Sequence, residues 1–290
     1  MTVTASSPIS GSSQKRYARV LSIAGSDSGG GAGIQADLKT CAALGCYGMT
    51  AITAITVQNT LGVTGIHGIP LNTVRDQIDA VVSDIGVDAV KIGMLATPEV
   101  VSVVADAIRR HQLTNVVLDP VMVATSGDRL IVPETAQALV SELFPLATVI
   151  TPNLDEAALL LGRSIDGIPA LDAAVADLLA LGAPSVLLKG GHLNGDVVMD
   201  VLGLQGQTAG DYLRLQSQRI VTHNGHGTGC TLSSAIASFL AQGLPLAQAV
   251  TEARRYILGA IEAGADVYTG HGHGPLNHGY APRAQRIVQG

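Results

Sequence analysis

Short apolar runs alternate with amphipathic segments along most of the 290-residue chain. Residues 49–57, rich in β-branched side chains and Thr, are typical of a strand. Val74, Ile78 and Val81 recur at helical spacing and predict an amphipathic helix over residues 72–85. The alternation of such segments predicts an α/β fold with a largely parallel sheet and helices on both of its faces.

The same patterns assign most of the remaining chain. The other predicted strands are residues 18–24, 63–69, 89–92, 115–118, 148–150, 185–189, 197–204 and 211–215. Further helices are predicted at residues 97–111, 133–144, 171–181 and 245–262. We find no internal repeat and no break in composition, so we expect a single domain over residues 16–290, with residues 264–290 mostly in loops. Residues 1–15 are rich in Ser and Thr and lack the apolar core of a secretory signal, and we expect a disordered tail there.

Residues 227–230 form a glycine-rich turn, which we call the second glycine turn because another one occurs earlier in the chain. It precedes an apolar helix face that starts at Leu232. The turn should therefore sit on a helix N-terminus, where free N–H groups and the helix dipole favour an anion such as a transferring phosphoryl group. Cys230 lies at the same position, where we expect the pKa of its thiol to be lowered. The alternative is a glycine-rich loop that caps a core helix containing a buried Cys.

Another glycine-rich turn, the first glycine turn (residues 25–33), joins a predicted strand to a helix that carries Ile34, Leu38 and Cys41 on one face. A strand, a glycine-rich turn and a helix in this order form a cradle for a ligand at the carboxyl end of the strand. Asp27 is either a site residue or an ordinary turn residue, and we expect Asp37 to be a solvated helix residue.

Polar side chains follow several other predicted strands. Gln58 carries a donor and an acceptor that suit the edge of a heterocycle, although an ordinary turn explains it equally well. Asp119 is a candidate for metal or phosphate chemistry, or a loop cap. Asn153 and Glu156 lie three residues apart at a helix start, and could act on Mg2+ through its water shell or form a capping box. Lys189 stands next to two glycines and could meet a polyphosphate.

Composition excludes several classes of protein. The chain is 47% hydrophobic and 14% charged, which is enough apolar material for a packed core. A net charge of −6 and only 3% aromatic residues argue against nucleic-acid binding. Three Cys residues in no zinc-like spacing indicate reduced thiols and a cytoplasmic setting. No uninterrupted apolar run is long enough to span a membrane.

Seven motifs, taken together and in order, resemble the hydroxymethylpyrimidine/phosphomethylpyrimidine kinases of the ribokinase-like superfamily. They are AGSDSGGGAGIQADLKT (24–40), QNT (58–60), KIGML (91–95), DPVM (119–122), TPNLDEA (151–157), KGGH (189–192) and HGTGCT (226–231). The resemblance spans residues 18–280 and implies a ribokinase-like three-layer αβα sandwich. Two departures are Gly225, where the family usually has Thr, and Ser28, where it often has Pro.

The resemblance also implies roles for individual residues. Gly227 and Gly229 would form an anion hole with the backbone of Cys230, and the Cys230 thiol would be the general base, where many ribokinase relatives have Asp. The residues implied to bind the pyrimidine substrate are Gln58, Gly25, Asp27, Met94 and Val121. The residues implied on the nucleotide side are Asn153, Lys189, Thr228 and Asp119, with Glu156 near the metal.

The implied activity is the phosphorylation of 4-amino-5-hydroxymethyl-2-methylpyrimidine, and then of its monophosphate, with ATP and Mg2+ in thiamine biosynthesis. A pyridoxal or pyridoxine kinase of vitamin B6 salvage is the enzymatic alternative, because its substrates are also aromatic heterocycles with a hydroxymethyl group. A non-catalytic pyrimidine-binding protein is the alternative from another class. The expected partners are small molecules and a second copy of the chain in a homodimer, with no nucleic acid and no membrane.

Overall fold

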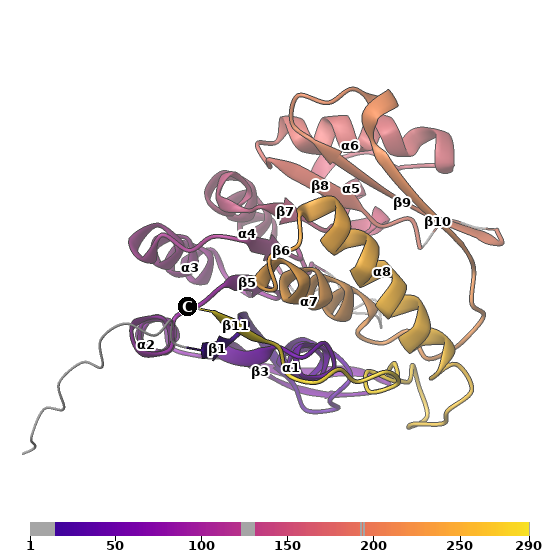
Figure 1. Ribbon diagram of the computed structural model, residues 1–290. Helices are drawn as coiled ribbons and strands as arrows, with labels where there is room; N and C mark the ends of the chain where they lie inside the picture. Colours follow the sequence, from indigo (N-terminus) through magenta and orange to yellow (C-terminus); the bar gives the residue numbers. More distant parts are fainter. Residues whose placement is uncertain (1–14, 123–130, 192, 194, 290) are drawn as a thin grey trace, which may run out of the picture.

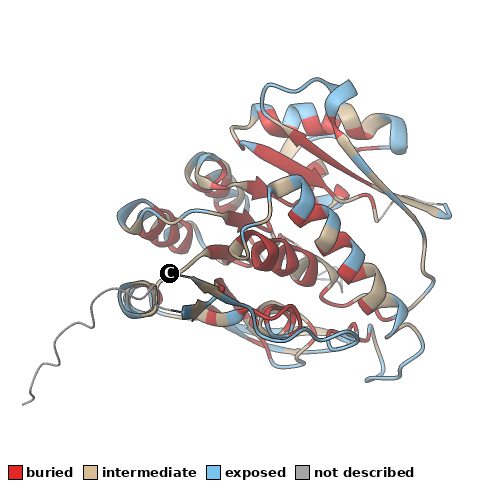
Figure 2. Ribbon diagram, viewed as in Figure 1, coloured by how far each residue is buried: buried red, intermediate tan, exposed pale blue. Residues whose placement is uncertain are grey.

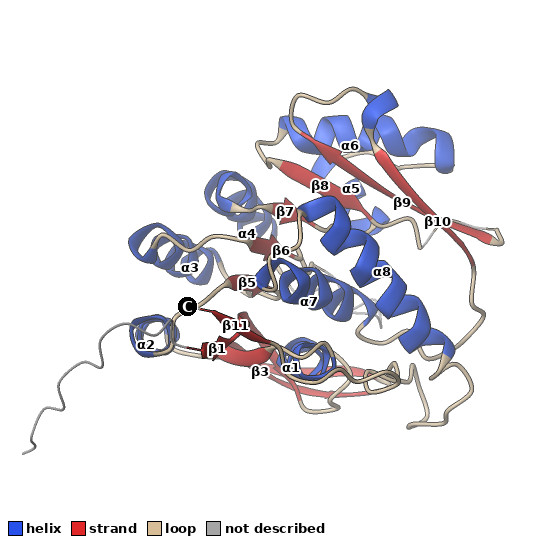
Figure 3. Ribbon diagram, in the orientation of Figure 1, coloured by secondary structure: helices blue, strands red, loops and turns tan. Residues whose placement is uncertain are grey.

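The centre of the molecule is a nine-stranded sheet between two layers of helices (Figures 1 and 3). The structure is a computed structural model that describes residues 15–122, 131–191, 193 and 195–289. Five of the eight strand pairs in this sheet are parallel, which confirms the predicted α/β class. The expected tail, residues 1–15, lies outside the described residues except for Lys15.

The sheet holds the predicted strands in an order that differs from their order in the sequence. In space they are β10 (Leu213–Gln218), β9 (Val197–Leu204), β8 (Ser185–Leu188), β7 (Val149–Ile150), β6 (Val116–Leu118), β5 (Ala89–Ile92), β2 (Arg19–Asp27), β3 (Tyr47–Asn59) and β4 (Gly62–Gly68). A separate antiparallel pair joins β1 (Lys15–Tyr17) to β11 (Ile287–Gln289), so the region expected to be mostly loop ends in a strand.

Helices cover both faces of the sheet. One layer contains α1 (Gly33–Ala43), α7 (Thr228–Ala241) and α8 (Leu246–Glu262). The other contains α2 (Leu71–Asp84), α3 (Pro98–His111), α4 (Pro133–Ala138), α5 (Leu154–Leu161) and α6 (Leu171–Ala180). Successive residues of β2 feed the two cores in turn, with Val20 in one and Leu21 in the other, as the period of a strand requires. Figure 2 shows the buried residues on both sides of the strands.

The helix predicted over 133–144 is shorter as an α-helix than expected. After α4 the chain continues as a π-helix (Leu139–Leu143) and a 3-10 turn (Phe144–Leu146). Pro145, which has no backbone N–H, lies in that turn and cannot continue an α-helical ladder. Two more 3-10 turns occur at Ile168–Ala170 and Ala209–Asp211.

Strand β2 marks the point where the sheet order reverses. Its neighbours β3 and β5 lie on opposite sides of it, and both run parallel to it. The chain leaves the carboxyl end of β2 through the first glycine turn and enters α1. In open α/β sheets such a reversal opens a crevice at the carboxyl ends of the strands, where ligands bind.

Candidate active site

The two glycine turns meet at their backbones. Gly227 is the N-cap of α7 and has φ +84°, and a Cβ atom placed there would overlap the carbonyl oxygen of Gly31. Gly33, with φ +54°, begins α1, and a Cβ there would overlap the carbonyl oxygen of Gly25. Only glycine provides both the left-handed backbone and the space at these positions. The N-termini of α1 and α7 therefore open on the same region.

A cavity of about 660 Å³ lies at this junction. It contains every site residue predicted from the sequence. These lining residues are Gly25, Asp27, Gln58, Met94, Asp119, Val121, Asn153, Glu156, Lys189, Gly227, Thr228, Gly229 and Cys230. The carboxyl ends of β2, β3, β5, β6 and β8 and the N-termini of α5 and α7 supply them. The structure thus brings the thirteen residues together, while their individual roles stay predictions.

Asp27 organises one end of the cavity. Its carboxylate accepts hydrogen bonds from the N–H groups of Gly29 (2.7 Å) and Ala32 (2.8 Å), and lies 2.9 Å from Nε2 of His226. Burial alone would raise the pKa of Asp27, but His226 and the backbone donors outweigh it and hold that pKa below its usual range. Asp27 is therefore a charged group that fixes the first glycine turn and His226.

Gln58 points into the same end of the cavity from the last residues of β3. Its Oε1 accepts a hydrogen bond from Oγ1 of Thr56 at 2.9 Å, and its Nε2 lies 3.4 Å from Nε2 of His226. Gly25 lies close to Met94, since a Cβ on Gly25 would lie 2.8 Å from Cε of Met94. The result is an apolar wall next to an oriented amide, which suits a polar heterocycle.

Charged side chains occupy the other end. Nζ of Lys189 donates to Oδ1 of Asp119 at 2.9 Å, and Oγ1 of Thr151 donates to the same atom at 3.0 Å. Burial alone would raise the pKa of Asp119, but Lys189 and then Lys91 outweigh it and lower that pKa. A Cβ on Gly229 would lie 3.2 Å from Nζ of Lys189, so the second glycine turn runs directly past this ion pair.

Asn153 and Glu156 form the capping box that was one of their two readings. Glu156 N–H donates to Oδ1 of Asn153 at 2.9 Å, and Asn153 N–H donates to Oε2 of Glu156 at 2.8 Å. Burial raises the pKa of Glu156 to about 7, Lys189 works against the shift and Asp119 adds to it. The capping reading is confirmed, and the action on a metal stays a prediction.

The residues around Glu156 fit a cation that brings most of its own ligands. Within the described parts of the chain, no group of three or more His, Cys, Asp or Glu side chains could hold a metal ion. Mg2+ usually keeps several waters and takes one or two carboxylates together with phosphate oxygens. Two buried carboxylates, Asp119 and Glu156, match that requirement better than they match a closed metal site.

Cys230 differs from the expectation for its thiol. It is the third residue of α7, half-buried and free of any disulfide. Burial raises its pKa to about 11, with Lys91 opposing the shift and Asp37 and Asp119 adding to it. The expected lowering is therefore wrong, because desolvation and two nearby carboxylates outweigh Lys91 and a backbone hydrogen bond at Gly33.

Comparison with known proteins decides the family. The family model for phosphomethylpyrimidine kinase matches residues 27–277. The chain belongs to the phosphomethylpyrimidine kinase family. It is 53% identical over 259 residues to a hydroxymethylpyrimidine/phosphomethylpyrimidine kinase of Rhizobium meliloti, covering 89% of this chain and 96% of that one.

Solved structures of related kinases share the fold. A phosphomethylpyrimidine kinase from Clostridium difficile has TM-score 0.73 and 42% identity, covering 84% of this chain and 99% of that one. A Bacillus subtilis pyridoxal kinase, solved as an ADP complex, has TM-score 0.80 and 40% identity, covering 90% and 97%. The predicted ribokinase-like sandwich is thus confirmed, and the chain is a phosphotransferase whose family implies ATP as phosphoryl donor. Within the described residues, no helix is long and apolar enough to cross a membrane.

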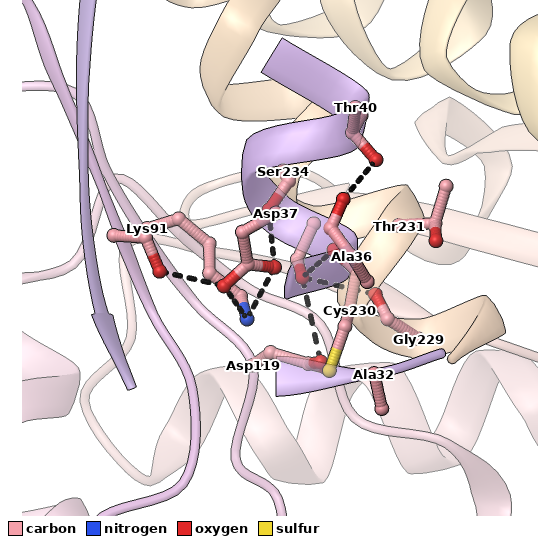
Figure 4. Close-up of polar contacts among 12 residues, drawn as sticks. Ala32, Ala36, Asp37, Thr40, Lys91, Asp119, Gly229, Cys230, Thr231 and Ser234 are labelled. Carbon is pink, nitrogen blue, oxygen red and sulfur yellow. Dashed lines mark hydrogen bonds and ion pairs between the residues drawn. The ribbon is translucent and has the colours of Figure 1, made fainter. Parts of the chain in front are cut away.

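Two residues near the site of this phosphomethylpyrimidine kinase family member were misjudged or missed from its sequence. Asp37, expected to be solvated, is fully buried and forms an ion pair with Lys91 at 2.9 Å (Figure 4). Lys91 lines the cavity and is itself fully buried. Both left a signal, because Asp37 falls on the apolar face with Ile34 and Cys41, and Lys91 interrupts a buried strand.

His226 was also missed as a site residue. It lies in a motif singled out for its glycines, yet its ring joins Asp27, 199 residues away, at 2.9 Å. A Cβ on Gly31 would overlap the His226 ring, so position 31 must be a glycine for the ring to lie there. The sequence signal was its place directly before the second glycine turn.

Proposed function

We propose that the protein phosphorylates the alcohol of 4-amino-5-hydroxymethyl-2-methylpyrimidine and then the resulting monophosphate, in thiamine biosynthesis. The observation that carries the proposal is the position of the second glycine turn in the cavity. Gln58, Asp27 and Met94 lie at one end and the Asp119–Lys189 ion pair at the other. A substrate alcohol bound at the first end and a triphosphate at the second would meet at the N-terminus of α7.

In this reaction the hydroxyl oxygen of the substrate attacks the terminal phosphorus of ATP as the bond to the ADP oxygen breaks. The backbone N–H groups of Gly227, Gly229 and Cys230 would stabilise the negative charge of the transferring group. Cys230 would take the hydroxyl proton. Because burial raises the pKa of this thiol to about 11, the role requires a lower thiol pKa when substrate and nucleotide are bound.

The nucleotide end would hold ATP through Asn153, Lys189, Thr228 and Asp119. Bound Mg2+ would neutralise phosphate charge there, with Glu156 acting on its water shell. Burial raises the pKa of Glu156 to about 7 because it destabilises the charged carboxylate. A cation next to this carboxylate would therefore be favourable.

A pyridoxal kinase is the second candidate, supported by the similarity to the Bacillus subtilis pyridoxal kinase along 90% of the chain. The test measures ADP release with MgATP and each alcohol, followed by mass analysis of the products. Two phosphates on the hydroxymethylpyrimidine would support our proposal and both of its steps. Turnover of pyridoxal alone would replace it with vitamin B6 salvage. Binding of the pyrimidine without ADP release would favour the non-catalytic alternative.

We further infer a cytoplasmic enzyme that works on small molecules and assembles as a homodimer. The three free thiols agree with a reducing compartment. The dimer rests on the family resemblance alone, and light scattering coupled to size-exclusion chromatography would measure it.

A further inference from the structure

A buried ion pair lies beneath the two glycine turns. The Asp37 carboxylate accepts hydrogen bonds from Nζ of Lys91 (2.9 Å), Oγ of Ser22 (2.6 Å) and Oγ of Ser234 (2.6 Å). All four side chains are buried, with at most 2% of each residue exposed. They come from four elements, α1, β5, β2 and α7, and Figure 4 shows Lys91 and Ser234 directed toward Asp37. This Asp37 cluster connects the sheet to the two helices that start at the glycine turns.

The cluster is placed to control the helix starts. Asp37 lies one turn after Gly33, where α1 begins, and Ser234 lies one turn after Cys230 on the same face of α7. The hydrogen bond between Ser234 and Asp37 therefore fixes the face of α7 that carries Cys230 against α1.

Stability alone is a poor explanation for this ion pair. Removing both charges from water costs about as much as their attraction returns, so a fully buried pair contributes little net stability. Lys91 also occupies space that a residue other than glycine at position 93 would take, because a Cβ there would lie 2.8 Å from Nζ of Lys91. The lysine head group lies at the cavity, where it can act on the site.

Four charged groups act on the Cys230 thiol. The ammonium groups are Lys91 on β5 and Lys189 after β8, and the carboxylates are Asp37 on α1 and Asp119 after β6. Asp119 is already paired with Lys189 at 2.9 Å. Figure 4 shows the Cys230 side chain directed toward the region between Lys91 and Asp119. Lys91 and Asp37 are likewise paired at 2.9 Å, so the field at the sulfur depends on both ion pairs, and Lys91 is the cation in this set that most opposes the raised pKa of the thiol.

We propose that Lys91, held in place by Asp37, is a positioning residue whose ammonium group sets how readily the Cys230 thiol releases its proton. The inference rests on the proposed role of Cys230 in proton transfer. The effect of the Lys91 ammonium on the thiol, however, does not depend on a bound substrate or nucleotide. It can thus be tested without turnover, so a failure of the inference and a failure of the proposed function are distinguishable.

The test measures the rate of Cys230 alkylation by iodoacetamide between pH 7.5 and 10, read by peptide mass spectrometry. The thiolate is the reacting form, and below the thiol pKa its fraction rises about tenfold per pH unit, so the alkylation rate at a fixed pH reports how readily the thiol releases its proton. Cys41 and Cys46 are buried and serve as internal indicators of unfolding in each variant. The same pH series on kcat then shows whether turnover follows the thiol.

Opposite charge changes should move the alkylation rate at a fixed pH in opposite directions. Lys91→Met should slow alkylation at pH 8.5 by about tenfold, and Asp37→Asn should speed it. Ser234→Ala is the matched control for a loosened α7, because it removes a hydroxyl from the Asp37 cluster and leaves both charges, and its alkylation rate should differ from the wild-type rate less than that of either charge variant. If the substitutions only loosened the site, the alkylation rate would instead change in the same direction in all three variants.

The inference would be overturned if the alkylation rate changed in the same direction in Lys91→Met and Asp37→Asn, or if it changed in neither folded variant. Should Lys91→Met fail to fold with Asp37 left unpaired, the double variant Lys91→Met/Asp37→Asn takes its place and should also slow alkylation. A wild-type alkylation rate in that folded double variant would equally overturn it. Absence of kinase activity in the wild-type protein would count against the proposed function and leave the alkylation result standing.

Discussion

Gly227 lies directly against the carbonyl oxygen of Gly31, so close that even a methyl group on Gly227 would overlap it. The two residues belong to the two glycine turns and are separated by most of the chain. Their contact sets where α7 begins relative to the end of β2, and with it the position of Cys230 relative to Asp27. The relative position of the two glycine turns thus depends on a backbone contact that only glycine permits.

Gly227→Ala should destabilise the protein by at least about 2 kcal/mol and abolish turnover. A non-glycine residue at φ +84° is strained, and the added methyl group must also displace Gly31. Thermal unfolding and a coupled ADP assay measure the two effects. Gly225→Ala is the control for stability, because Gly225 has no atom within 4 Å of its Cβ position and no positive φ. Equal unfolding temperatures for both variants would contradict the prediction.

Cys230→Ala should lower kcat by about 10²–10⁴-fold with little change in the KM for ATP, because it removes the proposed proton acceptor and leaves the backbone donors in place. Cys230→Asp should retain more activity than Cys230→Ala, since a carboxylate can accept the same proton. Steady-state kinetics for the pyrimidine alcohol decide it. Full turnover by Cys230→Ala would exclude Cys230 as the base.

Gln58→Glu should raise the KM for the pyrimidine alcohol by about tenfold or more. The new carboxylate can still accept the hydrogen bond from Thr56, but it cannot donate one to a ring nitrogen of the substrate. The KM for ATP is the internal control and should be unchanged, because Gln58 lies at the opposite end of the cavity from the Asp119–Lys189 pair. A rise in the KM for ATP alone would contradict the prediction and would assign Gln58 to the nucleotide.

The elements and the edge of the sheet that carries the site could be predicted from the sequence, because both follow from local periodicity. Gln58, Asp119 and Lys189 each follow or end an apolar run, and the carboxyl ends of parallel strands meet at one edge. The resemblance to a family added the roles that periodicity cannot supply.

The remaining features depend on partners far away in the chain. Asp37 is buried because Lys91 and Ser234, 54 and 197 residues away, pair with it, and no local pattern contains those contacts. The pKa of Cys230 results from burial and from charges on β5, on α1 and after β6, so its direction could not be obtained from its place at a helix start. A helix N-terminus does favour a thiolate, but the burial and the carboxylates that oppose it at Cys230 come from the fold and cannot be read from the sequence.

His278 should make the protein less stable as the pH falls from about 6.5 to about 4. Its Nε2 lies 2.9 Å from Oγ1 of Thr231 in the first turn of α7, and burial lowers its pKa to about 4. The unfolded chain binds the proton near pH 6.5 and the folded protein only near pH 4, so protonation favours unfolding between these values, by at most about 1.4 kcal/mol per pH unit. Urea unfolding at pH 7, 6, 5 and 4.5 should show this slope, and it should be smaller in His278→Gln. His67→Gln, a change at an exposed histidine of β4, should leave the slope as it is. A His278→Gln protein with the wild-type slope would assign the acid sensitivity to the carboxylates instead.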